Sequence, residues 1–416
     1  MARRKTASVA AWIILSLFAA GLAAGWYWWP RPQPISADAV RRPILAVLVF
    51  ENSNHTADLD FLANSLTHDT IAKIGQLCSG TADLIGHDSV LPYRNTRKTL
   101  HQVGAELGVD YILQGSVLRD GDKLHLTAQF TRNSDQVELW DFNEDRTIGD
   151  LSGFQNEIIQ KIADSLHVQI KPADLDAINR STTENSAARE AYLHAVENCE
   201  DSSENHLKEC IGLLQKALAA DPKYPRAHVA LADAELRLKN DYVTAEREVR
   251  EGLTATDAIP EAHYVLGDIF YKFRKDDKAA DQEFRKAVDL NRSESEARLR
   301  YVAFLLQANR VDEAQTEITR ALQLDPFRLA VNIMDGRVLI AAKSYDRAIE
   351  RLGNTVGLDR SSPEIRYYLG QAYLSRAMYD DAIREFEKAV SFGPKVVEYQ
   401  NALATAREAA RRAQAH

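Results

Sequence analysis

The first pattern along the chain after residue 42 mixes two spacings of apolar positions, one typical of strands and one of helices. In residues 43–170, alternating or short compact apolar runs are interrupted by segments in which apolar residues recur every three or four positions. The pattern predicts strands over 44–50, 111–118, 124–130 and 137–142, and helices over 59–77, 100–107 and 154–166. These elements predict a small mixed α/β domain, a sheet covered by two or three helices.

One strand shows its two faces directly in the sequence. Over 124–130 the apolar side chains of Leu124, Leu126, Ala128 and Phe130 alternate with polar ones. Successive side chains of a strand point to opposite faces, so one face of this strand is expected to be buried and the other to meet solvent. A tight turn over 119–122 precedes it and predicts a hairpin with the strand before it.

The second half of the chain repeats itself with a helical period. A small residue recurs 34 or 35 positions apart, at Cys210, Ala245, Ala280, Ala314, Ala348 and Ala382. Each is followed four residues later by an apolar residue, as in Ala382 and Phe386. This is the 34-residue helix-turn-helix period of tetratricopeptide repeats, in which the small residue allows two helices to approach closely. We therefore expect an all-α solenoid of six hairpins over 187–394, closed by a capping helix over 395–414.

The first helix of each hairpin is expected to line the concave surface of such a solenoid. Matching to the repeat pattern gives these candidate peptide-binding groove residues: Arg226, Asp233, Tyr264, Asp268, Tyr271, Arg337, Tyr367 and Gln371. Tyrosines beside scattered charges suit recognition of a protein or peptide partner, because aromatic anchors carry much of the binding energy at such surfaces. Packing between repeats is the alternative role for each of them.

The amino terminus carries a different signal. Residues 9–29 are almost wholly apolar, which is long enough to cross a bilayer as one transmembrane helix, and Arg3, Arg4 and Lys5 precede them. The positive-inside rule then predicts a cytoplasmic stub and anchor over 1–30, a linker over 31–42 and a periplasmic body, in a single-pass protein of a bacterial inner membrane. A cleaved signal peptide is the competing interpretation. Gly21 and Gly25 have the spacing of a helix-dimer motif, which is compatible with a homodimer, and the alternative is that small residues are simply common in such helices.

Residues 43–170 also resemble a known family. The segments 46–52, 61–69 and 106–117 match it in order and spacing, as do 126–129, Leu139-Trp140 and 155–158. The pattern resembles the TolB amino-terminal-like domain. The resemblance implies a non-catalytic domain that stands between a membrane helix and tetratricopeptide repeats in bacterial transmembrane regulators and some nucleotide cyclase architectures. Val49 and Ser65 stand where that family usually has proline and glycine.

Composition and charge narrow the function classes. The 416 residues carry a formal net charge of -9, and the acidic balance disfavours a nucleic-acid partner. No catalytic motif, metal-ligand spacing or nucleotide-binding loop occurs, so the sequence predicts no enzyme, no cofactor and no metal site. Cys199 and Cys210 are expected to bridge as a disulfide within one hairpin, with two free buried thiols as the alternative, and Cys78 is expected to be a lone core thiol.

These observations together predict a membrane-anchored periplasmic scaffold or sensor that binds a protein or peptide partner. The alternative is the periplasmic part of a signalling system that controls transcription or cyclic-nucleotide synthesis through a separately encoded cytoplasmic partner. A hydrolase hidden in residues 43–170 is a third hypothesis, disfavoured because no nucleophile and base stand in a recognisable motif.

Overall fold

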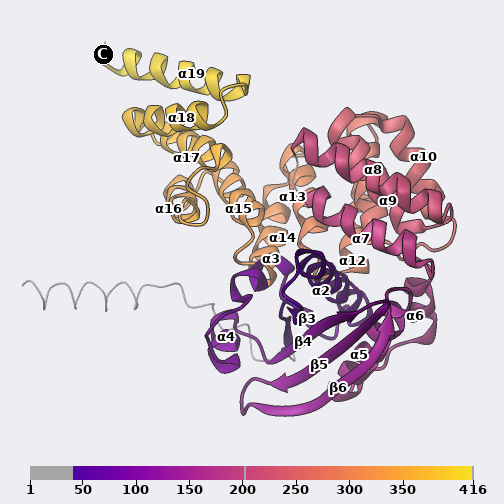
Figure 1. Cartoon of the computed structure of the whole chain (residues 1–416). Helices are drawn as coiled ribbons and strands as arrows, with labels where there is room; N and C mark the ends of the chain where they lie inside the picture. The colour runs from indigo at the N-terminus through magenta and orange to yellow at the C-terminus, as the bar shows by residue number, and fades with distance from the viewer. Residues whose placement is uncertain (1–40, 201–202, 415–416) are drawn as a thin grey trace, which may run out of the picture. The chain divides into compact units, whose positions relative to one another are not determined.

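The computed structural model describes residues 41–200 and 203–414, and residues 43–416 form one compact unit. Figure 1 shows two parts in sequence order, a curved sheet with flanking helices and then a series of helical hairpins. The mixed α/β part and the all-α part expected from the sequence are both present.

A six-stranded mixed sheet forms the first part. Its strands are β1 (Ile44–Val47), β2 (Glu51–Asn52), β3 (Asp83–Leu84), β4 (Tyr111–Asp120), β5 (Lys123–Arg132) and β6 (Val137–Thr147). The order is β3-β1-β4-β5-β6, with β2 pairing to β4. β3, β1 and β4 run parallel, whereas β4, β5 and β6 form an antiparallel meander. The expected strand over 44–50 is observed only over 44–47, and the two-residue strand β2 follows just after its expected end. β6 continues five residues past its expected end because its pairing with β5 extends to Lys123.

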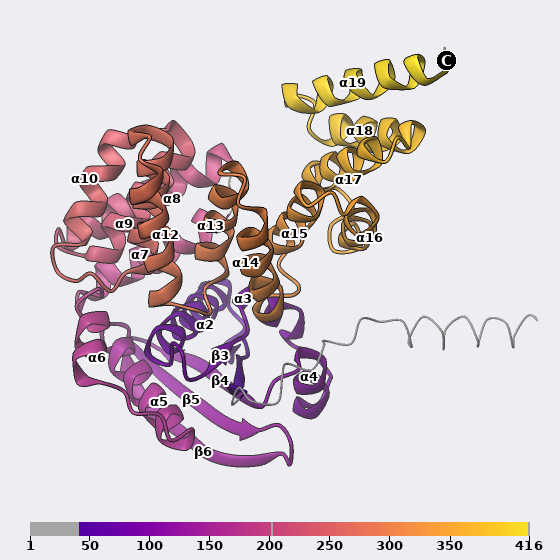
Figure 2. The ribbon, with the colours of Figure 1, turned by 180° about the vertical axis from the view of Figure 1, so that it is seen from behind.

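The alternation predicted over 124–130 is confirmed. Leu124, Leu126, Ala128 and Phe130 are at most 2% exposed, whereas His125 on the other face is exposed. Helix α5 (Leu151–Ser165) covers the apolar face, and its Phe154 ring lies 5.3 Å from that of Phe142 on β6. Figure 2 shows α5 lying along β6.

The remaining helices of this part are α2 (Ala57–Leu77), α3 (His87–Val90), α4 (Leu100–Leu107) and α6 (Pro172–Asn179), with short 3₁₀ turns at Leu91–Tyr93 and Ile148–Asp150. The predicted helix over 100–107 is confirmed in α4, and its ends explain its length. Thr99 and Gln102 form a capping box at its start. Gly108 ends it in the left-handed conformation, with φ 68°, which glycine adopts without steric cost.

Twelve helices form six antiparallel hairpins. The pairs are α7 (Ser186–Glu200) with α8 (Glu204–Ala220), α9 (Pro225–Lys239) with α10 (Tyr242–Gly252), α11 (Pro260–Ile269) with α12 (Asp277–Leu290), α13 (Ser295–Gln307) with α14 (Val311–Leu324), α15 (Leu329–Ala341) with α16 (Tyr345–Thr355), and α17 (Pro363–Ser375) with α18 (Tyr379–Phe392). A single π-helical turn, Phe270–Arg274, extends α11, and α19 (Val397–Gln414) packs on the last hairpin.

Close helix contact explains the repeated small residues. All six predicted small positions are fully buried, and so are the six apolar positions four residues later. In the last hairpin the Phe386 ring lies against Gly370 of α17, where an added Cβ would stand 2.7 Å from it. No larger side chain fits there without moving the two helices apart.

Each hairpin from the second to the sixth turns through one residue in the left-handed conformation. These residues are Asn240, Lys275, Asn309, Lys343 and Ala377, with φ between 53° and 58°. None of them is glycine, and a side chain in this conformation costs about 1–2 kcal/mol. The turn geometry is therefore imposed by packing of the flanking helices rather than by the residue at the turn.

A buried ion network joins the sheet part to the solenoid. Asp69 of α2 accepts from Arg226 of α9 at 2.5 Å and lies 3.5 Å from Arg189 of α7, and Gln155 of α5 donates to it at 3.0 Å. Burial would raise the pKa of Asp69, but the two guanidinium groups and Lys73 hold it well below its usual value. The carboxylate thus stays charged and holds four helices together, α2, α5, α7 and α9.

Two inter-repeat loops dock on the sheet part as well. Asp325, between α14 and α15, accepts from Ser89 of α3 at 2.6 Å, and the Leu324 carbonyl accepts from the Gly86 amide at 2.7 Å. The Ser293 hydroxyl, before α13, accepts from the Leu84 amide at 3.1 Å. An added Cβ at Gly86 would stand 2.4 Å from the Asp325 carboxylate, so this contact needs a glycine.

The membrane assignment made from the sequence is corrected here. Across residues 41–200 and 203–414, no helix combines the length and the apolar character needed to span a bilayer. The expected anchor over 9–29, its Gly21–Gly25 dimer motif and the linker over 31–42 fall outside the described residues, apart from Arg41 and Arg42. The fold class is therefore stated as a mixed α/β part followed by an all-α solenoid, without a transmembrane helix. The single-pass inner-membrane location, with its periplasmic body, is withdrawn with it, because it rested on that helix alone.

Replacing Ala377 by glycine is expected to stabilise the protein. The substitution removes the strain of a Cβ at φ 58°, partly offset by the greater freedom of glycine in the unfolded chain, for a net gain of about 0.5–1 kcal/mol in the free energy of unfolding. Urea unfolding followed by circular dichroism measures it. The matched control is Ala404→Gly in the exposed interior of α19, which should lose about 1 kcal/mol. A loss of stability in Ala377→Gly would contradict the assignment of strain to this turn.

Replacing Asp69 by asparagine is expected to destabilise the protein strongly. It leaves two buried guanidinium groups without their counter-charge, which costs about 3–5 kcal/mol. Asp346→Asn is the control, because Asp346 pairs with Arg376 at 2.7 Å on the surface and its loss should change stability little. Equal effects of the two substitutions in urea unfolding would contradict a structural role for the buried network.

Candidate functional site

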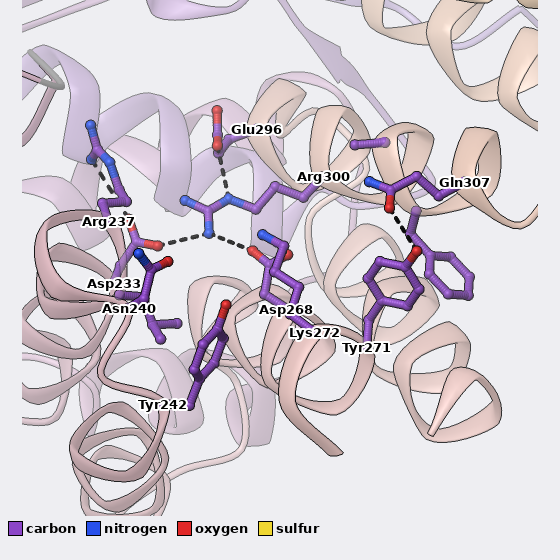
Figure 3. Close-up of a pocket in the computed structure, with 13 residues that line it drawn as sticks. Asp233, Arg237, Asn240, Tyr242, Asp268, Tyr271, Lys272, Glu296, Arg300 and Gln307 are labelled. Atoms are coloured by element: carbon purple, nitrogen blue, oxygen red, sulfur yellow. Dashed lines mark hydrogen bonds and ion pairs between the residues drawn. The ribbon is translucent and has the colours of Figure 1, made fainter. Parts of the chain in front are cut away.

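The first helices of three successive hairpins enclose a pocket of about 350 Å³. We call it the groove pocket, and Figure 3 shows it with its lining side chains. Its lining residues are Asp233, Leu236, Arg237, Asn240, Tyr242, Asp268, Tyr271, Lys272, Glu296, Arg300, Ala303, Phe304 and Gln307. They come mainly from α9, α11 with its π-helical turn, and α13, because residues about 34 positions apart fall on the same face of consecutive repeats.

Arg300 of α13 occupies the floor of the groove pocket. Its Nη1 lies 2.7 Å from Asp233 of α9 and 3.0 Å from Asp268 of α11, and its Nε lies 2.9 Å from Glu296 one turn earlier. The guanidinium also lies 4.3 Å from the centre of the Tyr264 ring, in cation–π contact. One cation thus joins three hairpins, as the dashed lines in Figure 3 show.

Glu296 connects this floor to the sheet part. Its second oxygen lies 2.7 Å from Arg328, which in turn lies 3.3 Å from Asp88 of α3. Burial alone would raise the pKa of Glu296, but Arg300 and Arg328 lower it to about 2. The carboxylate is therefore ionised at any pH near neutrality, and the floor carries a balanced set of charges.

The rim of the groove pocket is more exposed than the floor, and its side chains pair with one another. The Tyr271 hydroxyl donates to Gln307 at 2.7 Å, and Lys272 pairs with Asp268 at 2.7 Å. Tyr242 stacks on Phe273, with ring centres 5.4 Å apart. The arrangement presents aromatic faces, one amine and amide groups beside a charge-neutral floor, which suits an extended polypeptide better than a small anion.

The structure brings three of the eight predicted groove residues into this pocket, namely Asp233, Asp268 and Tyr271. Tyr264 is 8% exposed and supports the floor from below Arg300. Arg226 is directed away from the groove, into the buried contact with Asp69. Spacing alone does not reveal this, because the partner of Arg226 lies 157 residues earlier in the chain.

The other three predicted residues lie in the last two hairpins. The Tyr367 hydroxyl donates to Glu398 of α19 at 2.6 Å and accepts from Gln371 at 2.6 Å. Both residues thus help to pack the capping helix. Arg337 lies 5.2 Å from the ring centre of Tyr368, a contact between neighbouring repeats. None of the three lines the groove pocket.

Sequence reasoning missed Arg300 and Glu296, the residues that organise the floor. None of the eight candidate groove residues comes from α13, and the residue before Arg300, Leu299, is 6% exposed and packs in the core. The sequence does contain an indication of this ion pair, because Glu296 and Arg300 stand four residues apart, the spacing of ion pairs on one face of a helix.

The two cysteines expected to bridge lie together. Cys199 of α7 and Cys210 of α8 are paired as a disulfide, with Cα atoms 5.4 Å apart, a usual separation. The Cys199 carbonyl accepts from Arg237 at 2.6 Å, which brings the first hairpin to the edge of the groove pocket. Cys78 is a buried free thiol. Over the part of the chain that the structure describes, no group of three histidine, cysteine or acidic side chains could hold a metal ion.

Comparison with known proteins agrees with the helical repeats. Residues 239–295 and 339–406 each match a family model described as tetratricopeptide repeat. Over 219 residues the chain is 27% identical to a protein named putative adenylate cyclase 3 from Rhizobium meliloti (strain 1021). That match covers 50% of this chain and 36% of the relative, so the chain spans about a third of that protein's length.

The solved structures to which the chain is similar share low sequence identity with it. PilF of Pseudomonas aeruginosa is 22% identical with a TM-score of 0.36, covering 44% of this chain and 88% of its own. YrrB, titled a TPR protein with an unusual peptide-binding site, is 17% identical with a TM-score of 0.34, covering 45% and 96%. The Cut9–Hcn1 assembly is 14% identical with a TM-score of 0.44, covering 62% and 52%. The repeat period and the buried small positions run through all six hairpins, and the family matches identify residues 239–295 and 339–406 among them as tetratricopeptide repeats.

Proposed function

We propose that the protein binds a segment of a partner polypeptide in the groove pocket and acts as a non-enzymatic scaffold. The observation that carries the proposal is the state of the pocket, in which the charged floor is already paired and the rim is more exposed to solvent. Binding then requires little rearrangement of the protein, which lowers its cost in conformational entropy.

The floor supports this function by holding its shape. Arg300 contacts carboxylates from three helices, and Glu296 ties it to Arg328. Such paired charges keep consecutive hairpins at a fixed spacing. A partner therefore meets a surface whose aromatic and amide groups stand in set positions.

The rim supports a peptide rather than another ligand class. Tyr242 and Tyr271 are half-buried and supply flat faces, while Asn240, Lys272 and Gln307 are exposed and can bond to a peptide backbone. Tyrosine contributes large contact area with few rotatable bonds, which favours it at interfaces.

A second candidate function is regulation of cyclic-nucleotide synthesis or transcription through a separate partner. It is favoured by the 27% identity to a protein named as an adenylate cyclase. Since the chain covers 36% of that relative, its named activity is not transferred. The TolB amino-terminal-like identity of residues 43–170 belongs with this proposal, and the mixed sheet that precedes the repeats is compatible with it.

Rim substitutions are expected to weaken peptide binding without unfolding the protein. Peptides selected from a random display library on the wild-type protein should bind Tyr271→Ala at least tenfold more weakly, as loss of an aromatic anchor does. Lys272→Glu should weaken them similarly, because it places a second negative charge beside Asp268. Calorimetric titration of selected peptides measures both.

Lys216→Glu on the exposed side of α8 is the matched charge reversal outside the groove pocket, and it should leave these affinities unchanged. Selected peptides that bind all variants equally would remove the groove pocket from the mechanism.

The paired floor also predicts a pH dependence. The pKa of Glu296 falls from 4.5 to about 2 on folding, so its contribution to stability is present above pH 4.5 and is lost as the pH falls toward 2. Glu296→Gln should therefore lower the free energy of unfolding at pH 7 by about 2 kcal/mol, and the gap to wild type should narrow below pH 4.5. Urea unfolding at pH 7, 4 and 3 measures the gap, with the exposed Glu350→Gln as control. A gap that widens on acidification would contradict the assignment.

A further inference from the structure

A second and larger cavity, of about 670 Å³, lies on the sheet part of the chain, away from the repeats. It is bounded by the segment that leaves β1, by the loop before α4, and by the middle of β4, β5 and β6. The carboxyl end of a parallel strand is the usual place for a ligand in an α/β sheet, and β1 is the central strand of three parallel ones. The volume lies within the range of small-molecule sites.

The floor of this cavity is a regular array set by strand register. On β4, β5 and β6 the paired positions form two cross-strand rows of three. The rows are Gln114–Gln129–Asp141 and Ser116–Thr127–Asn143. Neighbours across a row have Cβ atoms about 5 Å apart, and the two rows stand about 7 Å apart along the strands. This polar array therefore has the footprint of a single six-membered ring with its substituents.

The array lies on the face of the sheet opposite the apolar core. Its residues alternate with Leu126, Ala128 and Phe130, which point into the core. Figures 1 and 2 show α5 along β5 and β6, on the face that carries the apolar core. The short helix α4 borders the cavity through Leu100 and Val103 and leaves the strands beyond it uncovered.

Hydrogen bonds within the array fix part of it and leave capacity for a ligand. Gln114 donates to Gln129, Gln129 donates to Glu138, and the Ser116 and Thr127 hydroxyls are 2.7 Å apart. In the described part of the chain, the structure assigns no hydrogen-bond partner to the side chains of Asp141 and Asn143. The first row thus ends in a carboxylate, that of Asp141, and the second row ends in an amide, that of Asn143, and both end groups can bond to a ligand.

The charges around the cavity select the ligand class. Lys98, at its edge, is engaged by Glu106 at 2.6 Å and lies over the Tyr93 ring. The other charged lining residues are Arg94, Glu51, Asp60 and Asp141, so carboxylates outnumber cations around the cavity. Asp141 projects from the floor and repels an anion. Five of the six array side chains are uncharged and short, unlike the long paired charges that usually cover a solvent-facing sheet. Paired amide, hydroxyl and carboxylate groups are the complement of adjacent hydroxyls, each of which both donates and accepts.

We propose that this cavity is a binding site for a neutral polyhydroxylated ring, a monosaccharide or cyclitol, held by the two rows of polar side chains. The site belongs to the sheet part and uses no residue of the groove pocket. The chain would then have a small-molecule binding site that is separate from the surface where the repeats bind a partner.

Saturation-transfer NMR on the full chain tests the proposal, with D-glucose, N-acetyl-D-glucosamine and myo-inositol as probes at millimolar concentration. At least one probe is expected to show transfer. Gln129→Ala should weaken its binding about tenfold, because this central amide accepts from Gln114 of its row and donates to Glu138, and its loss disorders the floor. Asn143→Trp should abolish it by filling the floor from an exposed position.

Lys123→Ala, at the exposed tip of the same hairpin, is the control and should bind as wild type does. Tyr271→Ala, in the groove pocket, should also retain the probe signal. A failure of peptide binding in the groove pocket can therefore be told apart from a failure of sugar binding in the sheet cavity. Circular dichroism establishes that each variant is folded. If Asn143→Trp does not fold, the binding measured for Gln129→Ala decides the test. Absence of transfer from all three probes, unchanged transfer in Gln129→Ala, or stronger transfer from D-gluconate than from D-glucose would overturn the proposal.

Discussion

The ion network around Asp69 is the constraint on which the arrangement of this protein depends. A carboxylate of α2 that is 8% exposed meets guanidinium groups from α7 and α9, and an amide from α5 completes its bonding. Breaking one partner of a buried pair leaves an uncompensated charge, so the elements it joins cannot separate without a large loss. Burial also lowers the pKa of Lys73, on the next turn of α2, to about 7. The sheet part and the first two hairpins are thus held as one body.

Ion pairs also connect the sheet part to the groove pocket, where the charged side chains are less buried than those around Asp69. Asp88 of α3, Arg328, Glu296 and Arg300 form a chain of ion pairs from the sheet part to the floor. Repeat arrays are usually stabilised only by contacts between neighbours. Here the sheet part contacts the loops before α13 and α15 as well, so the hairpins that form the pocket have a second source of order. This explains how a surface with several charges can be rigid enough to recognise a partner.

Some features could be predicted because they follow from local periodicity. The buried face of β5 and the small and large positions of each hairpin depend only on which residues share a face, and spacing determines that. Arg226 shows the limit of the method. Its place in the repeat is that of a groove residue, yet an acidic partner far away in sequence draws it into the interface. Arg300 shows the opposite error, because a residue that was not among the candidates takes the central role in the groove pocket.

By itself the sequence determined the strand alternation, the 34-residue period and the number of hairpins, because these express the geometry of single helices and strands. It also placed Cys199 and Cys210 on facing helices, which the structure pairs. Only the tertiary structure decided which polar residues are available to a ligand. Tyr367 and Gln371 bond to each other and, through Tyr367, to the capping helix. The register of three strands places Asp141 at the end of one polar row and Asn143 at the end of the other. The physical reason is that a polar side chain bonds to whatever group packing brings near it, and packing joins residues that are far apart in the chain.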